Sequence, residues 1–210
     1  MFLKGFFLLL CLRFFYGLSP DNFLTEKVRM RDGKYIAIDY YRSLTNEKLP
    51  VIFKMTPYGK SSSRSFRNEG EFWYRNGYIF AIADVRGTGD SEGEFELISN
   101  DGNDGYDLIE WIAKQPWSNG KVGMRGASYS GTNQLYIAAK NPKNLLCITP
   151  SASVGKFFDF PPFNKAFALN WALFWLGTAV NLPHKTNEWI HSDPSEWLNH
   201  LPLYTLDEYV

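Results

Sequence analysis

Residues that could hold a metal ion or form disulfides are few in this sequence. It contains two cysteines, Cys11 and Cys147, and three histidines among 210 residues. The spacings typical of zinc sites, Cys-x-x-Cys and His-Glu-x-x-His, are missing, so the sequence supports no metal site. Cys11 lies in an apolar leader, and its removal with that leader would leave no disulfide pair. Cys147 lies in the apolar run 145–149, and we expect it to be a small residue of the core.

An excess of charge of one sign is also absent. Lysine plus arginine and aspartate plus glutamate number 22 each, so the formal net charge is zero. This balance gives no electrostatic reason to expect a nucleic-acid partner or an anionic membrane surface. Aromatic residues, in contrast, make up 17% of the chain, which suits a large core or an apolar pocket. The length allows one large domain, or one domain and part of a second.

The first residues resemble a secretory signal peptide. Lys4 forms a short basic region and residues 6–12 form a short apolar one, as such signals require. Arg13 interrupts the apolar run, and Pro20 directly follows the nearest small-residue cleavage site. We therefore expect residues 1–19 to be a signal peptide or an N-terminal anchor. The expected location is secreted or periplasmic, with a cytoplasmic protein as the alternative.

Between residues 20 and 155, segments typical of strands alternate with segments typical of helices. Asp32-Gly33 lies between the first two strand segments and predicts a hairpin. The alternation predicts an α/β domain with a mostly parallel sheet. The expected strands are 27–30, 35–41, 51–55, 78–83, 122–125 and 145–149, and the expected helices are 66–75, 106–114 and 132–139.

The pattern becomes helical after about residue 155. Segment 166–180 is rich in Trp, Phe, Leu and Ala and is expected to be a helix, and 193–196 (DPSE) is typical of a helix start. The run 166–183 carries no charge over 18 residues, which touches the lower limit for a membrane span. Two asparagines interrupt that run, so a helix of an apolar lid is favoured over a membrane helix.

The segment 121–131, KVGMRGASYSG, carries the clearest chemical signal. A short apolar strand runs directly into 126–131, GASYSG, and a helix follows. This is the context of a nucleophile elbow, in which a serine hydroxyl is held out at the end of a sheet. The N-terminus of the following helix offers free N–H groups that can stabilise an oxyanion. The second glycine lies three residues after Ser128, not two as in G-x-S-x-G, so on the motif alone an ordinary glycine-rich turn is the alternative.

Three segments in order resemble the CocE/NonD hydrolases, a family that includes cocaine-esterase-like and X-Pro dipeptidyl-peptidase-like enzymes. They are 56–60 (TPYGK), 84–93 (DVRGTGDSEG) and 126–131 (GASYSG). In that family the glycine commonly stands at the third position after the serine, so the departure supports the resemblance. The resemblance implies an α/β-hydrolase fold, here truncated, with its core in residues 20–155 and the start of a helical cap domain in 156–210.

The resemblance also implies roles for single residues. Ser128 matches the nucleophile, Tyr129 supplies a backbone N–H to the oxyanion hole, and Tyr58 matches a tyrosine whose hydroxyl is the second donor, a role open to a phenol. The loop 84–93 shapes and braces the site, and the triad acid comes later in the chain than Asp84. The implied activity is hydrolysis of an acyl ester, an amino-acid ester or an X-Pro peptide through an acyl-enzyme at Ser128, with no metal or organic cofactor.

A base and an acid for Ser128 are not evident. In α/β-hydrolases the order is Ser, then Asp or Glu, then His, and His184, His191 and His200 all fall in the expected cap. Without a base a serine is a weak nucleophile, so we expect a fragment with little activity alone. The alternatives are a non-catalytic domain or pseudoenzyme, a split protein that pairs with a complementary C-terminal chain or a second copy, and a membrane-associated binding protein. The expected ligand is a small ester or amide, or a short peptide.

Overall fold

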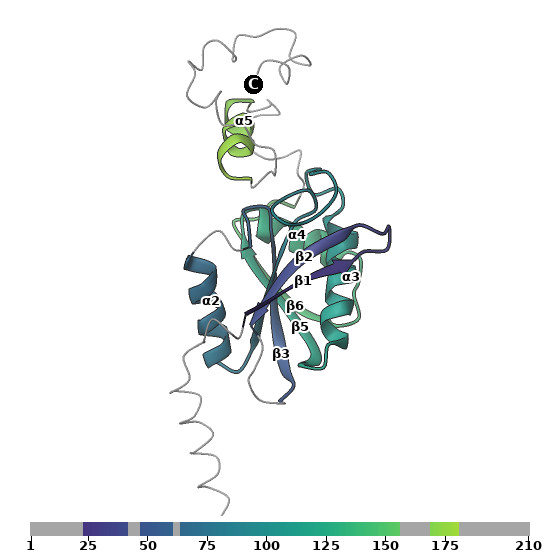
Figure 1. Ribbon diagram of the computed structural model, residues 1–210. Coiled ribbons are helices and arrows are strands. Elements are labelled where there is room, and N and C mark those ends of the chain that lie inside the picture. The colour runs from purple at the N-terminus through teal and green to yellow at the C-terminus, as the bar shows by residue number, and fades with distance from the viewer. Residues whose placement is uncertain (1–22, 42–46, 61–63, 156–168, 181–210) are drawn as a thin grey trace, which may run out of the picture.

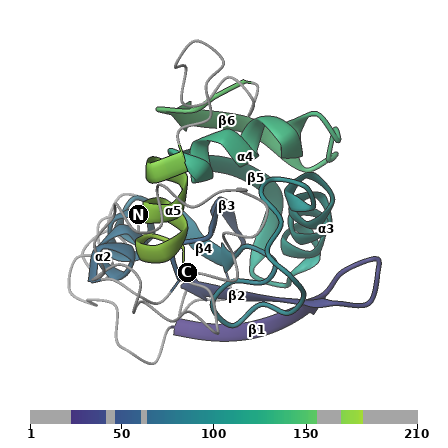
Figure 2. The ribbon, with the colours of Figure 1, turned by 90° about the horizontal axis from the view of Figure 1, so that it is seen from above.

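The computed structural model describes residues 23–41, 47–60, 64–155 and 169–180, and these form a sheet with helices on both faces (Figure 1, Figure 2). The strand order across the sheet is β1-β2-β4-β3-β5-β6. The elements, in chain order, are β1 (Phe23–Arg29), β2 (Tyr35–Tyr41), β3 (Leu49–Thr56), α2 (Arg64–Arg75), β4 (Ile79–Asp84), α3 (Asp101–Lys114), β5 (Ser118–Ala127), α4 (Tyr129–Ala138), β6 (Leu145–Ser151) and α5 (Leu169–Thr178).

Several predicted features lie outside the described residues. They are the leader 1–19, the helix start at 193–196 and the three histidines. The predicted helix 166–180 is described from its fourth residue onwards and contains α5. Across the described ranges, no helix has the length and apolar character that crossing a bilayer requires.

The sheet is mostly parallel, as the alternation of strands and helices predicted. β3 pairs in parallel with β4 and β5, and β5 pairs in parallel with β6, whereas β2 runs antiparallel to both β1 and β4. The predicted hairpin joins β1 to β2 and turns at Gly33, whose φ of 91° suits glycine. The carboxyl ends of the parallel strands therefore meet at one edge of the sheet, where open α/β sheets form their ligand sites.

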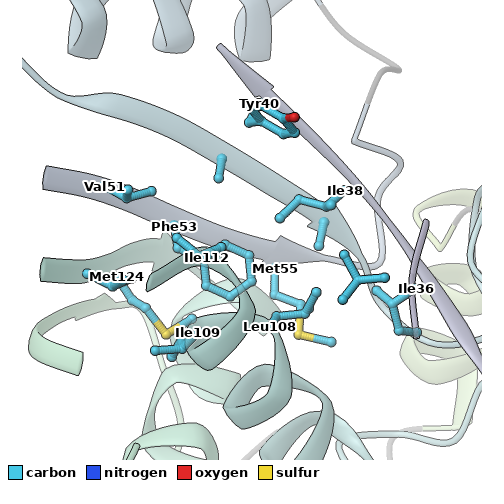
Figure 3. Close-up of a cluster of buried hydrophobic side chains, with 14 of the residues drawn as sticks. Ile36, Ile38, Tyr40, Val51, Phe53, Met55, Leu108, Ile109, Ile112 and Met124 are labelled. Atoms are coloured by element: carbon cyan, nitrogen blue, oxygen red, sulfur yellow. The ribbon is translucent and has the colours of Figure 1, made fainter. Parts of the chain in front are cut away.

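The main core lies between the sheet and helices α3 and α4 (Figure 3). Phe53 of β3 and Leu108 of α3 are fully buried there. β4 contributes side chains to both faces of the sheet, and this explains why its sequence is apolar without interruption. Ala81 belongs to this main core, whereas Phe80, on the opposite face of the sheet, packs towards Trp73 of α2. A strand covered on both sides needs apolar residues at every position, not at alternate ones.

Helix α3 begins five residues before the predicted start at Tyr106. Gly102 and Gly105 make the first turns of this helix intrinsically unfavourable, because glycine disfavours helix interiors. Packing against α4 outweighs that preference: a Cβ at Gly105 would approach Cδ1 of Ile137 to 2.3 Å, so only glycine allows the two helices this close. The extra turns place Asp101 at the start of α3, deep in the protein.

The prediction that Cys147 is a core residue is wrong. Its side chain is exposed, and the neighbouring Leu146 is 64% exposed. The run 145–149 forms β6, which pairs only with β5 within the described part of the chain. An apolar run alone does not distinguish a central strand from an edge strand, and here the apolar residues lie at the edge of the sheet.

Candidate active site

Ser128 occupies the sharp turn between β5 and α4. Its backbone has φ 59° and ψ −125°, a left-handed conformation that costs free energy for any residue other than glycine. The carbonyl oxygen of Ser128 accepts the N–H groups of Gly131 and Thr132, at 3.0 and 2.9 Å. Its own N–H donates to the carbonyl oxygen of Ser151 in β6, at 3.1 Å. These bonds hold the strained turn and leave the side chain exposed at the carboxyl end of the sheet.

Two glycines make this turn possible. A Cβ at Gly126 would lie 2.4 Å from the carbonyl oxygen of Ser130, and one at Gly131 would lie 2.6 Å from the carbonyl oxygen of Ser151. Real Cβ atoms do not approach backbone oxygens this closely, so both positions require glycine. Gly131, the third residue after Ser128, is the position against which β6 packs. This explains why the second glycine of the motif stands there.

The side chain of Tyr58 reaches Ser128 from the neighbouring strand. Tyr58 lies on the turn that follows β3, and its hydroxyl oxygen is 3.3 Å from Oγ of Ser128. The N–H of Tyr58 donates to Oγ1 of Thr56, at 3.2 Å, which fixes the start of the turn. The structure therefore brings together two of the predicted site residues that are 70 positions apart in the sequence.

Tyr129, the third predicted site residue, is the first residue of α4. The first N–H groups of a helix have no acceptor within it, so this N–H is available beside Ser128. The phenol of Tyr129 points into the protein, where its hydroxyl donates to Asp101 at 3.1 Å and accepts the N–H of Ile98 at 3.0 Å. Burial raises the pKa of the Tyr129 phenol, and the nearby Asp101 raises it further.

Aromatic rings surround the serine on the side of α5. Trp175 of α5 stacks on Tyr129 with 6.0 Å between ring centroids, and it meets Tyr58 and Phe95 edge-on or tilted at 6.4 Å. Figure 2, which looks down on the sheet from this end, shows α5 lying over the sheet. The space beside Ser128 is therefore bordered by apolar rings.

An ion network around the buried Lys60 fixes the turn that carries Tyr58. Asp39 and Asp84 in this network are buried, whereas Asp90 is exposed. Nζ of Lys60 lies 2.6 Å from Asp90, 3.3 Å from Asp39 and 3.8 Å from Asp84. Burial alone would lower the pKa of Lys60, but the hydrogen bond to Asp90 and the charges of Asp39 and Asp84 raise it overall. The lysine therefore stays charged, and it ties the turn to β2, to β4 and to the loop 84–93.

Asp84 braces this loop through its side chain. Its two carboxylate oxygens accept the backbone N–H groups of Lys60 and Asp90, at 2.7 and 3.1 Å. Burial raises the pKa of Asp84 to about 6, although those two N–H groups and the charge of Lys60 oppose the shift. These contacts agree with the bracing role inferred for the loop. They occupy both oxygens of Asp84 with main-chain donors.

Arg86, in the same loop, joins it to two other parts of the fold. Its guanidinium forms two hydrogen bonds to the buried Asp104 of α3, at 2.8 and 2.6 Å. A third bond, of 2.6 Å, reaches Asp32 in the hairpin between β1 and β2. This fork-shaped pairing is the geometry for which arginine is suited.

Some residues of the site region were missed by sequence reasoning. Asp39 interrupts an otherwise apolar strand, and this was a signal that could have marked a buried charge. Asp101 and Asn133 gave no such signal, because their contact joins two helices that are separate in the sequence. In the described ranges, no cluster of three or more Asp, Glu, His and Cys side chains is arranged to hold a metal ion.

Replacing Gly126 with alanine should destabilise the protein. The added Cβ meets the backbone of α4, which cannot move without disturbing the turn, and such overpacking typically costs about 1–3 kcal/mol. Gly155→Ala is the matched control, because, apart from its two chain neighbours, no atom of the described residues lies within 4 Å of the Cβ it would add, and it should change stability by less than about 0.5 kcal/mol. Equal unfolding free energies for the two variants in urea denaturation would contradict the close approach of strand and helix.

Comparison with known proteins places this chain in a family. Residues 32–195 match the model of the X-Pro dipeptidyl-peptidase (S15) family. The chain is 35% identical over 146 residues to cocaine esterase of Rhodococcus sp. (strain MB1 Bresler), covering 68% of this chain and 25% of the esterase. It is 25% identical over 166 residues to Xaa-Pro dipeptidyl-peptidase of Lactobacillus delbrueckii subsp. lactis, covering 68% of this chain and 19% of that protein. The chain therefore spans about a quarter or less of these relatives.

Solved structures agree with the fold. A CocE/NonD family hydrolase from Staphylococcus aureus superposes with a TM-score of 0.59 at 29% identity, covering 64% of this chain and 28% of that one. An alpha-amino acid ester hydrolase gives a TM-score of 0.56 at 26% identity, covering 63% and 26%. These matches confirm the predicted α/β-hydrolase fold and the resemblance to the CocE/NonD hydrolases. Since the family model covers most of the sequence, this chain belongs to the X-Pro dipeptidyl-peptidase (S15) family.

Proposed function

We propose that this chain carries the nucleophile and the oxyanion-binding groups of a serine hydrolase that cleaves an ester or an amide. One observation carries the proposal: the exposed Ser128 sits in a strained strand-to-helix turn, with Oγ 3.3 Å from the hydroxyl of Tyr58. A strained conformation persists only where the surrounding structure holds it, and such residues cluster at active sites. The relatives named as an esterase and a dipeptidyl-peptidase support the same chemistry.

The proposed reaction begins with attack of Ser128 Oγ on the carbonyl carbon of the substrate. The electron pair of the carbonyl double bond moves to oxygen, and the N–H of Tyr129 and the hydroxyl of Tyr58 donate hydrogen bonds to the resulting oxyanion. Donors placed in advance at this position act mainly on the transition state, where the charge develops. When the carbonyl re-forms, the alcohol or amine leaves with a proton, and the acyl ester on Ser128 is then hydrolysed by water.

A base must take the serine proton in this scheme. None of the described residues is a histidine, and His184, His191 and His200 lie outside them. A second candidate is a non-catalytic domain that keeps the turn without the base. Both candidates are tested on the product of the complete reading frame, because a serine hydrolase needs its acid and its histidine together with these residues.

The proposed substrates are an acyl ester, an amino-acid ester or an X-Pro peptide. The aromatic border formed by Trp175, Phe95 and Tyr129 supports an uncharged group next to the scissile bond. Esters and amides pass through the same tetrahedral intermediate, so one oxyanion site serves both. Because the relatives' names include both an esterase and a dipeptidyl-peptidase, the proposal includes both ester and amide bonds.

Ser128→Ala should abolish hydrolysis of an activated aryl ester, with a fall in kcat of at least about 10³-fold, because the attacking oxygen is removed. Ser130→Ala is the matched control two residues away. It removes a buried hydroxyl for which the described part of the chain offers no hydrogen-bond partner, so both fold and turnover should be kept. Turnover by Ser128→Ala equal to that of the wild type would reject the proposal, and a complete gene product without any turnover would favour the non-catalytic domain.

Tyr58→Phe should keep the fold and lower kcat by about 10²–10³-fold, since loss of one oxyanion donor typically has this effect. The ring stays, so substrate affinity should change much less than kcat. Tyr78→Phe is the control, because Tyr78 precedes β4 at the opposite edge of the sheet from the site. Steady-state kinetics separate the alternatives: a fall in kcat of less than about fivefold would mean that the Tyr58 hydroxyl does not stabilise the oxyanion.

A further inference from the structure

Asp101, the first residue of α3, is a buried carboxyl group whose hydrogen-bond partners are uncharged. Its side chain is 1% exposed, and it forms no ion pair with any described residue. It accepts hydrogen bonds from the phenol of Tyr129, at 3.1 Å, and from the amide of Asn133, at 3.3 Å. A carboxyl group placed in such surroundings does not favour folding, so its presence calls for another explanation.

The first of these bonds fixes the residue that follows Ser128. The hydroxyl of Tyr129 is held from two sides, by Asp101 and by the N–H of Ile98. The ring lies between this anchor and the backbone of Tyr129, and Trp175 stacks on one of its faces at 6.0 Å. The anchored ring therefore limits rotation at the start of α4, and with it the direction of the backbone N–H of Tyr129.

The second bond leads to the strand that carries Tyr58. The amide nitrogen of Asn133 donates both to Asp101 and to the carbonyl oxygen of Met55, at 3.3 and 3.0 Å. Met55 is the penultimate residue of β3, directly before Thr56, and Oγ1 of Thr56 accepts the N–H of Tyr58. The same carboxyl group is thus connected to both donors of the proposed oxyanion site.

We propose that Asp101 is a positioning residue that holds the backbone N–H of Tyr129 and the hydroxyl of Tyr58 in their relative places beside Ser128. This inference rests on the proposed serine hydrolase function. Its geometric basis is that one buried carboxyl group joins α3, α4 and the end of β3. Small displacements of an oxyanion donor lower the rate strongly, because the donor must meet charge that exists only in the transition state.

The charge state of Asp101 supports this role. Burial raises its pKa to about 7, against the opposing effect of the hydrogen bonds from Asn133 and Tyr129, and the neighbouring Asp104 raises it as well. Because its pKa is raised from the ordinary value of 3.8, this group makes the protein less stable as the pH rises from about 4 to about 7, and the full cost remains above pH 7. The residue is therefore poorly suited to a purely stabilising role at neutral pH.

Asp101→Asn tests the inference in the product of the complete reading frame. The variant keeps the shape of the side chain and an acceptor oxygen for the hydroxyl of Tyr129. Its new NH2 group faces the NH2 group of Asn133, so the hydrogen bond that connects residue 101 through Asn133 to β3 is lost. We expect kcat for an activated aryl ester to fall by about tenfold to a hundredfold, while KM changes little. Asp107→Asn, on the exposed side of α3 where its carboxylate binds Arg31, is the matched control and should leave kcat unchanged.

Two further measurements make the outcome decisive. Tyr129→Phe removes the other connection and keeps the ring, and it should lower kcat with KM nearly constant even if Asp101→Asn does not fold. Unchanged kcat in a folded Asp101→Asn or Tyr129→Phe protein, with turnover still dependent on Ser128, would overturn the inference alone. Turnover that does not depend on Ser128 would overturn the proposed function, and the inference with it.

Discussion

The close approach of β5, α4 and β6 around Ser128 is the constraint on which the rest of the site depends. Gly126 and Gly131 let backbone atoms come within distances that no side chain would allow. The serine at the centre takes a positive φ as a result, and its carbonyl oxygen and N–H are both used to hold the turn. This arrangement projects the hydroxyl beyond the sheet and sets the first N–H of α4 beside it.

A second requirement is that the end of β3 stays in register with this turn. Charged side chains meet that requirement: Lys60 pairs with buried carboxylates of β2 and of the end of β4, and with an exposed carboxylate of the loop 84–93. Breaking a buried ion pair typically costs about 3–5 kcal/mol, so the turn that carries Tyr58 is not free to drift. Arg86 extends the same bracing to α3 and to the hairpin between β1 and β2. The polar interior of this domain thus serves mainly to place a few side chains at one edge of the sheet.

The sequence was informative where a feature is local, and it failed where a feature depends on contacts between distant segments. The turn at Ser128 could be predicted because strand, small residues and helix follow one another within a dozen positions. Tyr58 was found only through family resemblance, since nothing in its own segment distinguishes it from an ordinary loop tyrosine. The contact between Asp101 and Asn133, the early start of α3 and the exposed position of Cys147 all depend on how elements pack, and no spacing in the sequence encodes that.

The central claim is that Ser128 forms a covalent acyl-enzyme, and covalent trapping tests it most directly. A fluorophosphonate loses fluoride when an activated serine oxygen attacks phosphorus, and it leaves a stable phosphonyl ester on that residue. Intact-mass analysis and peptide mapping of the labelled gene product should show one adduct, on the peptide that contains Ser128, with turnover lost in proportion to labelling. An adduct on a different residue, or full turnover with Ser128 unlabelled, would contradict the account.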